Sequence, residues 1–304
     1  MAHTGELQTP QRRRLRIVSF NNIPAAFDTV RQWAEQSGHT IMLVVTSPGP
    51  KTRRSDGFKQ IAATAGEQNI EVLITTRLKT VATPILHSLK PDLIVSASFP
   101  WLLPPELRQT ARLGAVNLHP AVLPAYRGPN ALRQFYEAAP IIGATLHWTD
   151  DDFDTGRILS QRTAPLPRPC TFENIVAVWL PTITAALEEG AARAIAGERG
   201  TPQPEAGASY AAAFSESEHW LDFTEPAFTL QCKVTALSFF GSSHAKAHIA
   251  GQDWLIERLD LVEAAPTTAN PGSAIEQCAD GLIVQAGDGA VKIKATPHSE
   301  AASV

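Results

Sequence analysis

The stretch LRIVSFNNIPAAFDTVRQWAEQSGHTIMLVVT (residues 15–46) decides the expected fold class. Its two ends, LRIVSF (15–20) and TIMLVVT (40–46), are near-continuous apolar runs of strand length. Between them, FDTVRQWAEQSG (27–38) predicts a helix that ends at Gly38. Buried strands separated by a helix are typical of a parallel sheet that is covered on both faces. The stretch therefore predicts a doubly wound, Rossmann-like α/β fold.

The same alternation of strands and helices continues through IEVLITT (70–76), VATPILHSL (81–89) and DLIVSA (92–97). The segment SFNNIPAAF (19–27) stands where a dinucleotide-binding fold would carry its glycine-rich loop. It has no G-x-G-x-x-G pattern, which argues against a nicotinamide cofactor.

Residues 171–197 predict a long helix that closes this α/β domain. Thr171 is the expected N-cap and Glu173 supports the first turn. Pro181 is expected to kink or divide the helix. A linker rich in Gly and Pro, GERGTPQPEAG (197–207), follows.

Beyond the linker the pattern changes to short alternating strands, which predict a small β-barrel. These strands are HAKAHIAG (244–251), DWLIERLDL (253–261), GLIVQAG (281–287) and AVKIKA (290–295). We therefore expect three parts: a flexible polar tail (1–14), an α/β domain (15–200) and a C-terminal β domain (201–304).

Three polar residues are the candidates for chemistry, and they lie in GAVNLHPAVLPAYRG (114–128) and DDDFDTGRIL (150–159). GAVNL predicts a short strand, so Asn117 and His119 project from the same face. An amide can donate a hydrogen bond to a developing oxyanion, and an imidazole can transfer a proton near neutral pH. Asp154, brought beside His119, would orient the ring and favour its protonated form.

These motifs resemble the formyltransferase family that uses 10-formyltetrahydrofolate. The resemblance rests on Asn-Leu-His-Pro (117–120), Leu-Pro-Ala-Tyr-Arg-Gly (123–128) and Asp-Thr-Gly (154–156), in order and at similar spacing. KPDLIVSASFPWLLPPEL (90–107) and GATLHW (143–148) resemble further segments of the family. The match is dense from residue 90 to residue 161 and looser elsewhere.

The resemblance implies a Rossmann-like formyltransferase domain over 15–200 and an OB-like C-terminal domain. It also implies 10-formyltetrahydrofolate as co-substrate and Asn117, His119 and Asp154 as the catalytic residues. The residues expected to contact the folate are Phe99, Trp101, Leu102, Asp151 and Asp152. Those expected to contact the formyl acceptor are Tyr126, Arg127 and Asn130.

The charge of the C-terminal part of the chain bears on the identity of the formyl acceptor. Residues 201–304 hold 13 Asp and Glu against 5 Lys and Arg, a net charge of −8, whereas the rest of the chain carries +4. A domain with this charge should repel tRNA. YRGPN (126–130) also departs from the YRGAAP of the family's tRNA enzyme. We therefore expect a small-molecule amine or hydroxylamine, such as an amino sugar or an ornithine derivative.

Alternatives to this acceptor stay open. The first is methionyl-tRNA, for which Lys51, Arg53, Arg54 and Lys59 offer a basic loop. The second is water, which would make the protein a formyltetrahydrofolate hydrolase. A folate- or nucleotide-binding protein without catalytic activity is the remaining alternative, and the intact set of three catalytic residues argues against it.

Composition indicates the class of protein and its expected compartment. The 304 residues are 44% apolar and 18% charged, as in an ordinary globular protein. Apolar runs fall short of the roughly 20 residues of a membrane span, and we expect no secretory signal. Three scattered cysteines indicate reduced thiols in a cytoplasm, and the nine histidines lack metal-ligand spacing. We expect no metal and no membrane partner, and leave a homodimer open.

Overall fold

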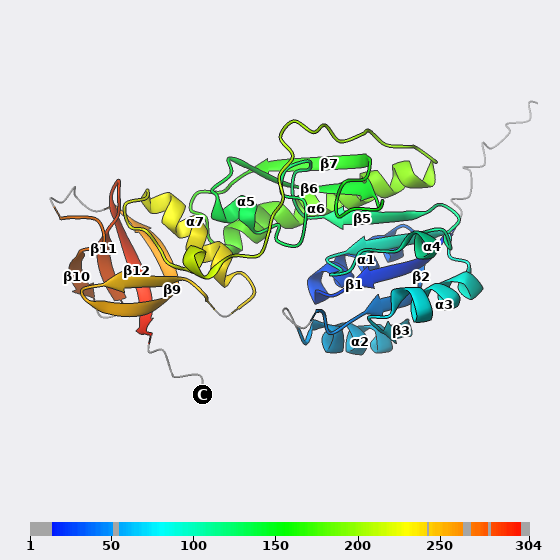
Figure 1. Cartoon of the computed structure of the whole chain (residues 1–304), viewed down its shortest axis with the longest axis horizontal. Helices are drawn as coiled ribbons and strands as arrows, with labels where there is room; N and C mark the ends of the chain where they lie inside the picture. The colour runs from blue at the N-terminus through cyan, green and yellow to red at the C-terminus, as the bar shows by residue number, and fades with distance from the viewer. Residues whose placement is uncertain (1–13, 51–54, 242, 264–268, 279–280, 299–304) are drawn as a thin grey trace, which may run out of the picture.

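The structure is a computed structural model that describes residues 14–50, 55–241, 243–263, 269–278 and 281–298. It contains a seven-stranded sheet flanked by helices and a separate five-stranded sheet formed by the C-terminal part of the chain (Figure 1). This arrangement confirms the predicted fold class.

The seven-stranded sheet has the order β3-β2-β1-β4-β5-β6-β7. Its strands are β1 (Arg16–Asn21), β2 (Thr40–Thr46), β3 (Glu71–Ile74), β4 (Leu93–Ala97), β5 (Ala115–His119), β6 (Ile141–Trp148) and β7 (Ile158–Pro165). The helices around it are α1 (Pro24–Gln36), α2 (Gly57–Glu67), the π-helical turn η2 (Leu78–Ala82), α3 (Thr83–Leu89), α4 (Pro105–Arg108), α5 (Arg133–Tyr136) and α6 (Phe172–Ile195).

The sheet is mixed rather than wholly parallel, which corrects the prediction. Strands β1 to β5 pair in parallel, but β5 pairs antiparallel with β6, and β6 antiparallel with β7. The connection from β5 to β6, residues 120–140, contains only the four-residue helix α5. A parallel return is usually made by a longer helix that covers the sheet. Here the chain turns back beside β5 instead.

Alternate residues of the central strands face two different apolar layers. Ile17 of β1 lies in a cluster with Trp33 of α1 and Leu187 of α6. Its neighbour Val18 lies in a cluster with Leu86 of α3. Helices therefore cover both faces of the sheet, which leaves the ends of its strands free for a site.

Helix α6 begins as predicted, with the Thr171 side chain accepting a hydrogen bond from the Asn174 N–H. Of the two predicted effects of Pro181, division does not occur, because the helix continues through this residue. Pro181 is exposed, so the carbonyl that its missing N–H leaves without a partner can bond to water. Helix α6 has the length and composition of a membrane span, but it packs on β6 and β7 with residues such as Leu187 and Ala191 buried.

The five-stranded sheet is antiparallel, with the order β10-β11-β12-β9-β8. Its strands are β8 (Lys246–Ile249), β9 (Gln252–Val262), β10 (Ala274–Cys278), β11 (Gly281–Gln285) and β12 (Ala290–Pro297), preceded by the 3-10 helix η3 (Glu216–His219) and by α7 (Ala227–Ser238). Neither α7 nor β10 was predicted from the sequence. Leu230 of α7 shares a buried apolar cluster with Phe135 and Trp179, so this core runs from the second sheet to α5 and α6.

Candidate active site

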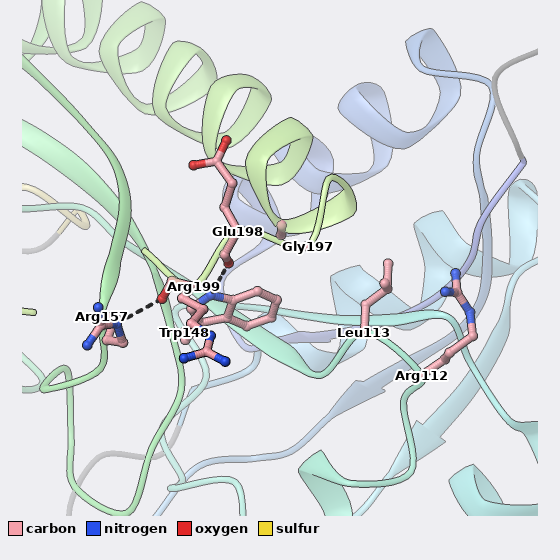
Figure 2. Close-up of a pocket in the computed structure, with 8 residues that line it drawn as sticks. Arg112, Leu113, Trp148, Arg157, Gly197, Glu198 and Arg199 are labelled. Atoms are coloured by element: carbon pink, nitrogen blue, oxygen red, sulfur yellow. Dashed lines mark hydrogen bonds between the residues drawn. The ribbon is translucent and has the colours of Figure 1, made fainter. Parts of the chain in front are cut away.

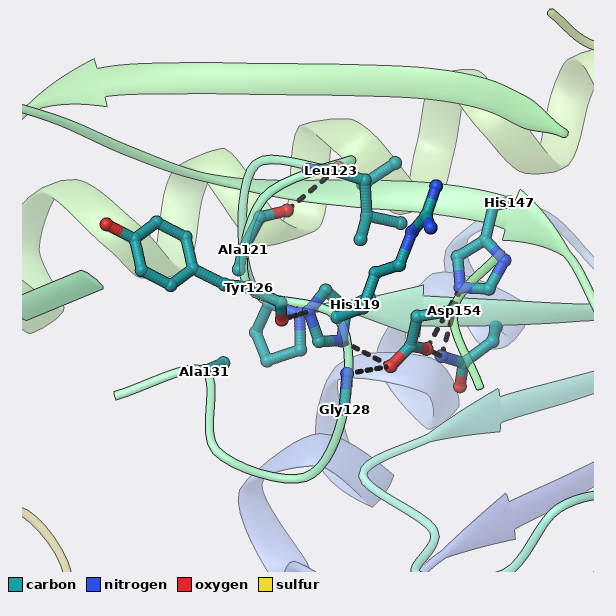
Figure 3. Close-up of polar contacts among 12 residues, drawn as sticks. His119, Ala121, Leu123, Tyr126, Gly128, Ala131, His147 and Asp154 are labelled. Atoms are coloured by element: carbon teal, nitrogen blue, oxygen red, sulfur yellow. Dashed lines mark hydrogen bonds and ion pairs between the residues drawn. The ribbon is translucent and has the colours of Figure 1, made fainter. Parts of the chain in front are cut away.

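Strand β5 presents Asn117 and His119 two residues apart. Asp154, in the loop that joins β6 to β7, lies next to His119 (Figure 3). Asn117 Nδ2 donates to Asp154 Oδ1 over 2.9 Å, and His119 Nδ1 lies 3.4 Å from Asp154 Oδ2. The structure therefore brings together all three residues that were selected from the sequence.

Asp154 occupies a tightly built turn. Its φ is +59°, in the left-handed region, and its Oδ2 accepts a hydrogen bond of 2.8 Å from the Gly128 N–H. Gly156, two residues on, leaves no room for a side chain, because a Cβ there would lie 1.6 Å from the Trp148 carbonyl oxygen. Close packing of the loop thus fixes where the carboxylate points.

A fourth polar residue, His147, completes the cluster and was not selected from the sequence. In the antiparallel register it lies directly opposite Asn117 on β6. His147 Nε2 is 3.2 Å from Asn117 Nδ2 and 3.3 Å from Asp154 Oδ1. The sequence signal for it is a lone histidine at the end of an apolar strand. That signal is insufficient, because the sequence does not show the direction of this strand and therefore not which residue of β5 lies opposite His147.

The ring nitrogens of both histidines are oriented by backbone carbonyls. His119 Nε2 lies 2.7 Å from the Tyr126 carbonyl oxygen, and His147 Nδ1 lies 2.8 Å from that of Trp148. A carbonyl only accepts, so each of these nitrogens carries a hydrogen. In neutral rings the lone pairs are then on His119 Nδ1, facing Asp154, and on His147 Nε2, facing Asn117.

Burial and the Asp154 carboxylate act in opposite directions on the charge of His119. Burial lowers the pKa of His119 below its ordinary value; Asp154 and the Tyr126 carbonyl oppose that effect without cancelling it. His119 is 4% exposed, so its charged form loses nearly all its hydration. Asp154 therefore favours the protonated ring, as predicted, but burial outweighs it and the resting ring is neutral.

Asp154 keeps its charge despite its surroundings. Burial would raise the pKa of this carboxyl, but the His119 and His147 rings and the Gly128 N–H outweigh burial and lower the pKa below its ordinary value. At neutral pH the cluster therefore combines an ionised carboxylate with a neutral imidazole.

The loop after β5 carries the expected acceptor residues. Tyr126 has a φ of +61° and offers its carbonyl to His119, while burial and Glu137 raise the pKa of its hydroxyl to about 12. Arg127 donates through Nε to Gln203 Oε1 over 3.0 Å. Asn130 is buried, and its amide donates to the Ala212 carbonyl. Asn130 thus fastens the loop to the segment that follows α6.

A hollow of about 430 Å³ opens beside this loop. It is lined by Arg127, Asp152, Phe153, Thr155, Ala208, Ser209 and Tyr210. Phe153 and Tyr210 are 43% and 62% exposed, large values for aromatic side chains. Gly128, with φ +102°, lies under the Tyr210 ring, where a Cβ would come within 2.5 Å of the ring. We call this hollow the acceptor pocket, after the role proposed for it below.

The residues expected to contact folate have different partners in the structure. Phe99 is buried and packs edge-on against Phe20, with the ring centroids 5.2 Å apart. Trp101 donates through Nε1 to Ser47 Oγ, and Leu102 is 38% exposed. Asp151 forms an ion pair with Arg108, and Asp152 lines the acceptor pocket. Their role in folate binding stays a prediction.

A second hollow, of about 630 Å³, has a different lining (Figure 2). Its lining includes Arg112, Trp148, Arg157 and Arg199. Trp148 donates to the Glu198 carbonyl, and Arg157 donates to those of Arg199 and Gly200. Within the described part of the chain, no group of three or more His, Cys, Asp or Glu residues could hold a metal ion.

Comparison with known proteins follows the same division of the chain. The family model described as formyl transferase matches residues 15–177, more than half of the chain, and that described as formyl transferase, C-terminal domain, matches residues 214–301. The methionyl-tRNA formyltransferases of Chromohalobacter salexigens and Paraburkholderia phymatum are 30% and 31% identical over 272 and 281 residues. These alignments cover 86% and 85% of the chain and 82% of each relative.

Two solved structures share the fold. An N-formyltransferase from Helicobacter canadensis, solved with folinic acid and dTDP-3-aminofucose, has a TM-score of 0.67 and 17% identity over 93% of this chain and 100% of that one. HypX from Aquifex aeolicus, solved with tetrahydrofolic acid, has a TM-score of 0.62 and 19% identity. That match covers 95% of this chain and 45% of the HypX chain. With both domains of the family matched in order around the Asn117, His119 and Asp154 cluster, the chain belongs to the formyl transferase family.

Proposed function

We propose that the protein transfers a formyl group from 10-formyltetrahydrofolate to a primary amine or hydroxylamine of a small molecule, such as an amino sugar or an ornithine derivative. The observation that carries the proposal is the cluster of Asn117, His119 and Asp154 next to the acceptor pocket, joined to it through the Gly128 N–H.

In the proposed reaction the neutral amine of the acceptor attacks the formyl carbon. Both N–H groups of Asn117 have acceptors, Asp154 Oδ1 at 2.9 Å and His147 Nε2 at 3.2 Å. The formyl oxygen would replace the longer of these contacts and receive the hydrogen bond as negative charge develops on it. One such donor contributes about 3–4 kcal/mol to transition-state stabilisation.

His119 is the proposed proton carrier between the amine and N10 of the folate. A neutral imidazole with a lone pair on Nδ1 is the form that can accept a proton. Once protonated, both of its N–H groups have acceptors: the Tyr126 carbonyl at 2.7 Å and the Asp154 carboxylate at 3.4 Å. Asp154 therefore stabilises the imidazolium during transfer, although it does not hold the ring in that form beforehand.

The acceptor pocket supports a small acceptor by its size and by the charge around it. A volume of about 430 Å³ is within the range of small-molecule sites. Ala208, Ser209 and Tyr210 of its lining belong to residues 201–304, whose net charge of −8 opposes a phosphate backbone.

Methionyl-tRNA is the alternative acceptor, and it is favoured by the names of the curated relatives, which are 28–31% identical to this chain. The basic residues Lys51, Arg53 and Arg54, which would serve it, lie outside the described residues. Water is the second alternative, and the same catalytic cluster could then release formate.

The folate is proposed to bind between the 99–103 and 150–154 segments, at the edge of the sheet where open α/β folds place ligands. Arg108 of α4, just beyond the first segment, bonds to the Thr149 carbonyl and to Asp151. We further propose a cytoplasmic protein, because all three cysteines are free thiols.

The deciding experiment incubates the purified protein with 10-formyltetrahydrofolate and one acceptor at a time: nucleotide-linked amino sugars, hydroxyornithine, methionyl-tRNA, or none. Mass spectrometry identifies the formylated product, and an enzymatic assay measures released formate. We expect turnover with a small amine. Rapid formylation of methionyl-tRNA alone would establish the tRNA enzyme, and formate release without any amine would establish the hydrolase.

A further inference from the structure

The residues that follow helix α6 form a strap, defined here as residues 198–203, along the start of β7. The Trp148 indole N–H donates to the Glu198 carbonyl, and Arg157 Nε donates to the Arg199 and Gly200 carbonyls (Figure 2). Thr201 and Ile158 exchange two backbone hydrogen bonds of 2.8 Å. The strap is therefore held in a fixed register next to the loop that carries Asp154.

Gln203 is the point at which this strap reaches the catalytic loop. Its Nε2 donates to the Asp154 carbonyl over 2.7 Å and to the Gly156 carbonyl over 2.8 Å. Its Oε1 accepts from Arg127 Nε over 3.0 Å. The amide orientation is settled by its partners, since two carbonyls need donors and a guanidinium needs an acceptor. Among residues 201–207, Gln203 alone is half-buried, and the other six are exposed.

The loop needs such support because its backbone is strained. A left-handed conformation at a residue other than glycine costs on the order of 1 kcal/mol, and Asp154 adopts it at φ +59°. The Asp154 and Gly156 carbonyls, on either side of Thr155, both point to the Gln203 amide. One side chain thus fixes the direction of two peptide groups in the turn that aims the carboxylate.

We propose that Gln203 is a positioning residue for formyl transfer: it holds the Asp154 loop with its amide nitrogen and Arg127, at the acceptor pocket, with its amide oxygen. The proposal rests on the proposed catalytic role of Asp154. It makes the strap after α6, rather than the loop alone, responsible for the placement of the carboxylate. Arg127 and Asp154 would consequently move together.

The two ends of the amide can be tested separately. In Gln203→Glu the shape and the oxygen facing Arg127 are kept, but a carboxylate oxygen replaces the donor to the two carbonyls. We expect kcat to fall about 10–100-fold, the range for a displacement of about 1 Å in a catalytic group, with little change in acceptor KM. In Gln203→Met both ends are lost, so acceptor KM should rise as well.

Glu205→Gln is the matched control, an exchange of carboxylate and amide at an exposed position of the same segment with no side-chain contact among the described residues. Asp154→Asn is measured in parallel, and thermal unfolding verifies that each variant is folded. Loss of kcat in Gln203→Glu and the added KM effect in Gln203→Met would support the proposal. A pH profile adds an independent readout: displacing Asp154 removes an attraction that raises the pKa of His119, so the acid limb should move to lower pH.

Two outcomes would overturn the proposal, and they are distinguishable. If both folded Gln203 variants match Glu205→Gln in kcat while Asp154→Asn is impaired, Gln203 has no positioning role and the catalytic cluster stands. If Asp154→Asn itself turns over normally, the catalytic assignment fails, and the role of Gln203 fails with it.

Discussion

Replacing Asp154 with asparagine tests the centre of the proposed mechanism, because it changes one atom and almost no volume. Asp154 Oδ1 accepts from Asn117 Nδ2 over 2.9 Å, and Oδ2 accepts from the Gly128 N–H over 2.8 Å. An amide must place its NH₂ group against one of these donors. The variant therefore contains a buried donor that faces another donor.

This unpaired donor should lower the stability of the Asp154→Asn variant. Leaving one buried donor without an acceptor costs about 1–3 kcal/mol, so the free energy of unfolding should fall by about that amount. The catalytic cost is larger. The imidazolium of His119 loses its only carboxylate partner among the described residues, and Asn117 loses the group that aims its amide. We expect kcat to fall by about 10²–10⁴, the range for general acid–base catalysis.

A matched control separates the two costs. Asp92 is also a buried carboxylate that accepts two hydrogen bonds, from the Arg16 N–H at 3.0 Å and from Arg112 Nε at 2.8 Å. It precedes β4, and these two hydrogen bonds are to residues outside the catalytic cluster. Asp92→Asn should therefore lose stability with kcat unchanged.

The assay measures formyl transfer at saturating substrates together with denaturant unfolding of the same preparations. If Asp154→Asn is folded and its kcat stays within a few-fold of the unmodified protein, the reasoning from the cluster geometry is refuted. Equal losses of kcat in Asp92→Asn would show that lowered stability, and not lost chemistry, explains the effect.

The other predictions concern the same cluster and the surface around it. His119→Ala and Asn117→Ala should each reduce formyl transfer by at least about two orders of magnitude, measured as kcat in folded protein; near-normal turnover in either would exclude it from the mechanism. The His119 ring should titrate below pH 6.5 by NMR. As pH falls through 6.5 the unfolded chain gains a proton that the folded chain does not, so stability should drop by up to about 1.4 kcal/mol per pH unit, and a His119→Asn variant should lack this slope. Binding of tRNA should be weak, roughly 10⁻⁴–10⁻⁶ M in a filter-binding assay at physiological salt; submicromolar affinity would contradict the charge argument.

Several features of the protein follow from local sequence alone. The pairing of Asn117 with His119 on one face needs only the two-residue period of a strand. The Thr171 cap and the helix end near Gly38 depend on side chains and backbone within one turn of their own positions. The α/β class likewise follows from apolar runs of strand length separated by a helix.

Other features arise from contacts that no local pattern contains. His147 joins the cluster because β6 runs antiparallel to β5, a direction set by how the chain between them packs. The neutral state of His119 depends on its burial, to which distant segments contribute. Gln203 is a polar residue of the predicted linker, and it reaches Asp154 only because the strap lies against β7.

Local sequence patterns are therefore sufficient to identify the residues that could perform the chemistry and the class of fold that carries them. The charge, orientation and support of those residues depend on the folded chain, because periodicity and capping act within only a few residues. Strand direction, desolvation and the partners of a buried amide depend instead on contacts between distant parts of the chain. Gln203 and Asp154, for example, lie 49 positions apart in sequence, yet Gln203 Nε2 is 2.7 Å from the Asp154 carbonyl oxygen.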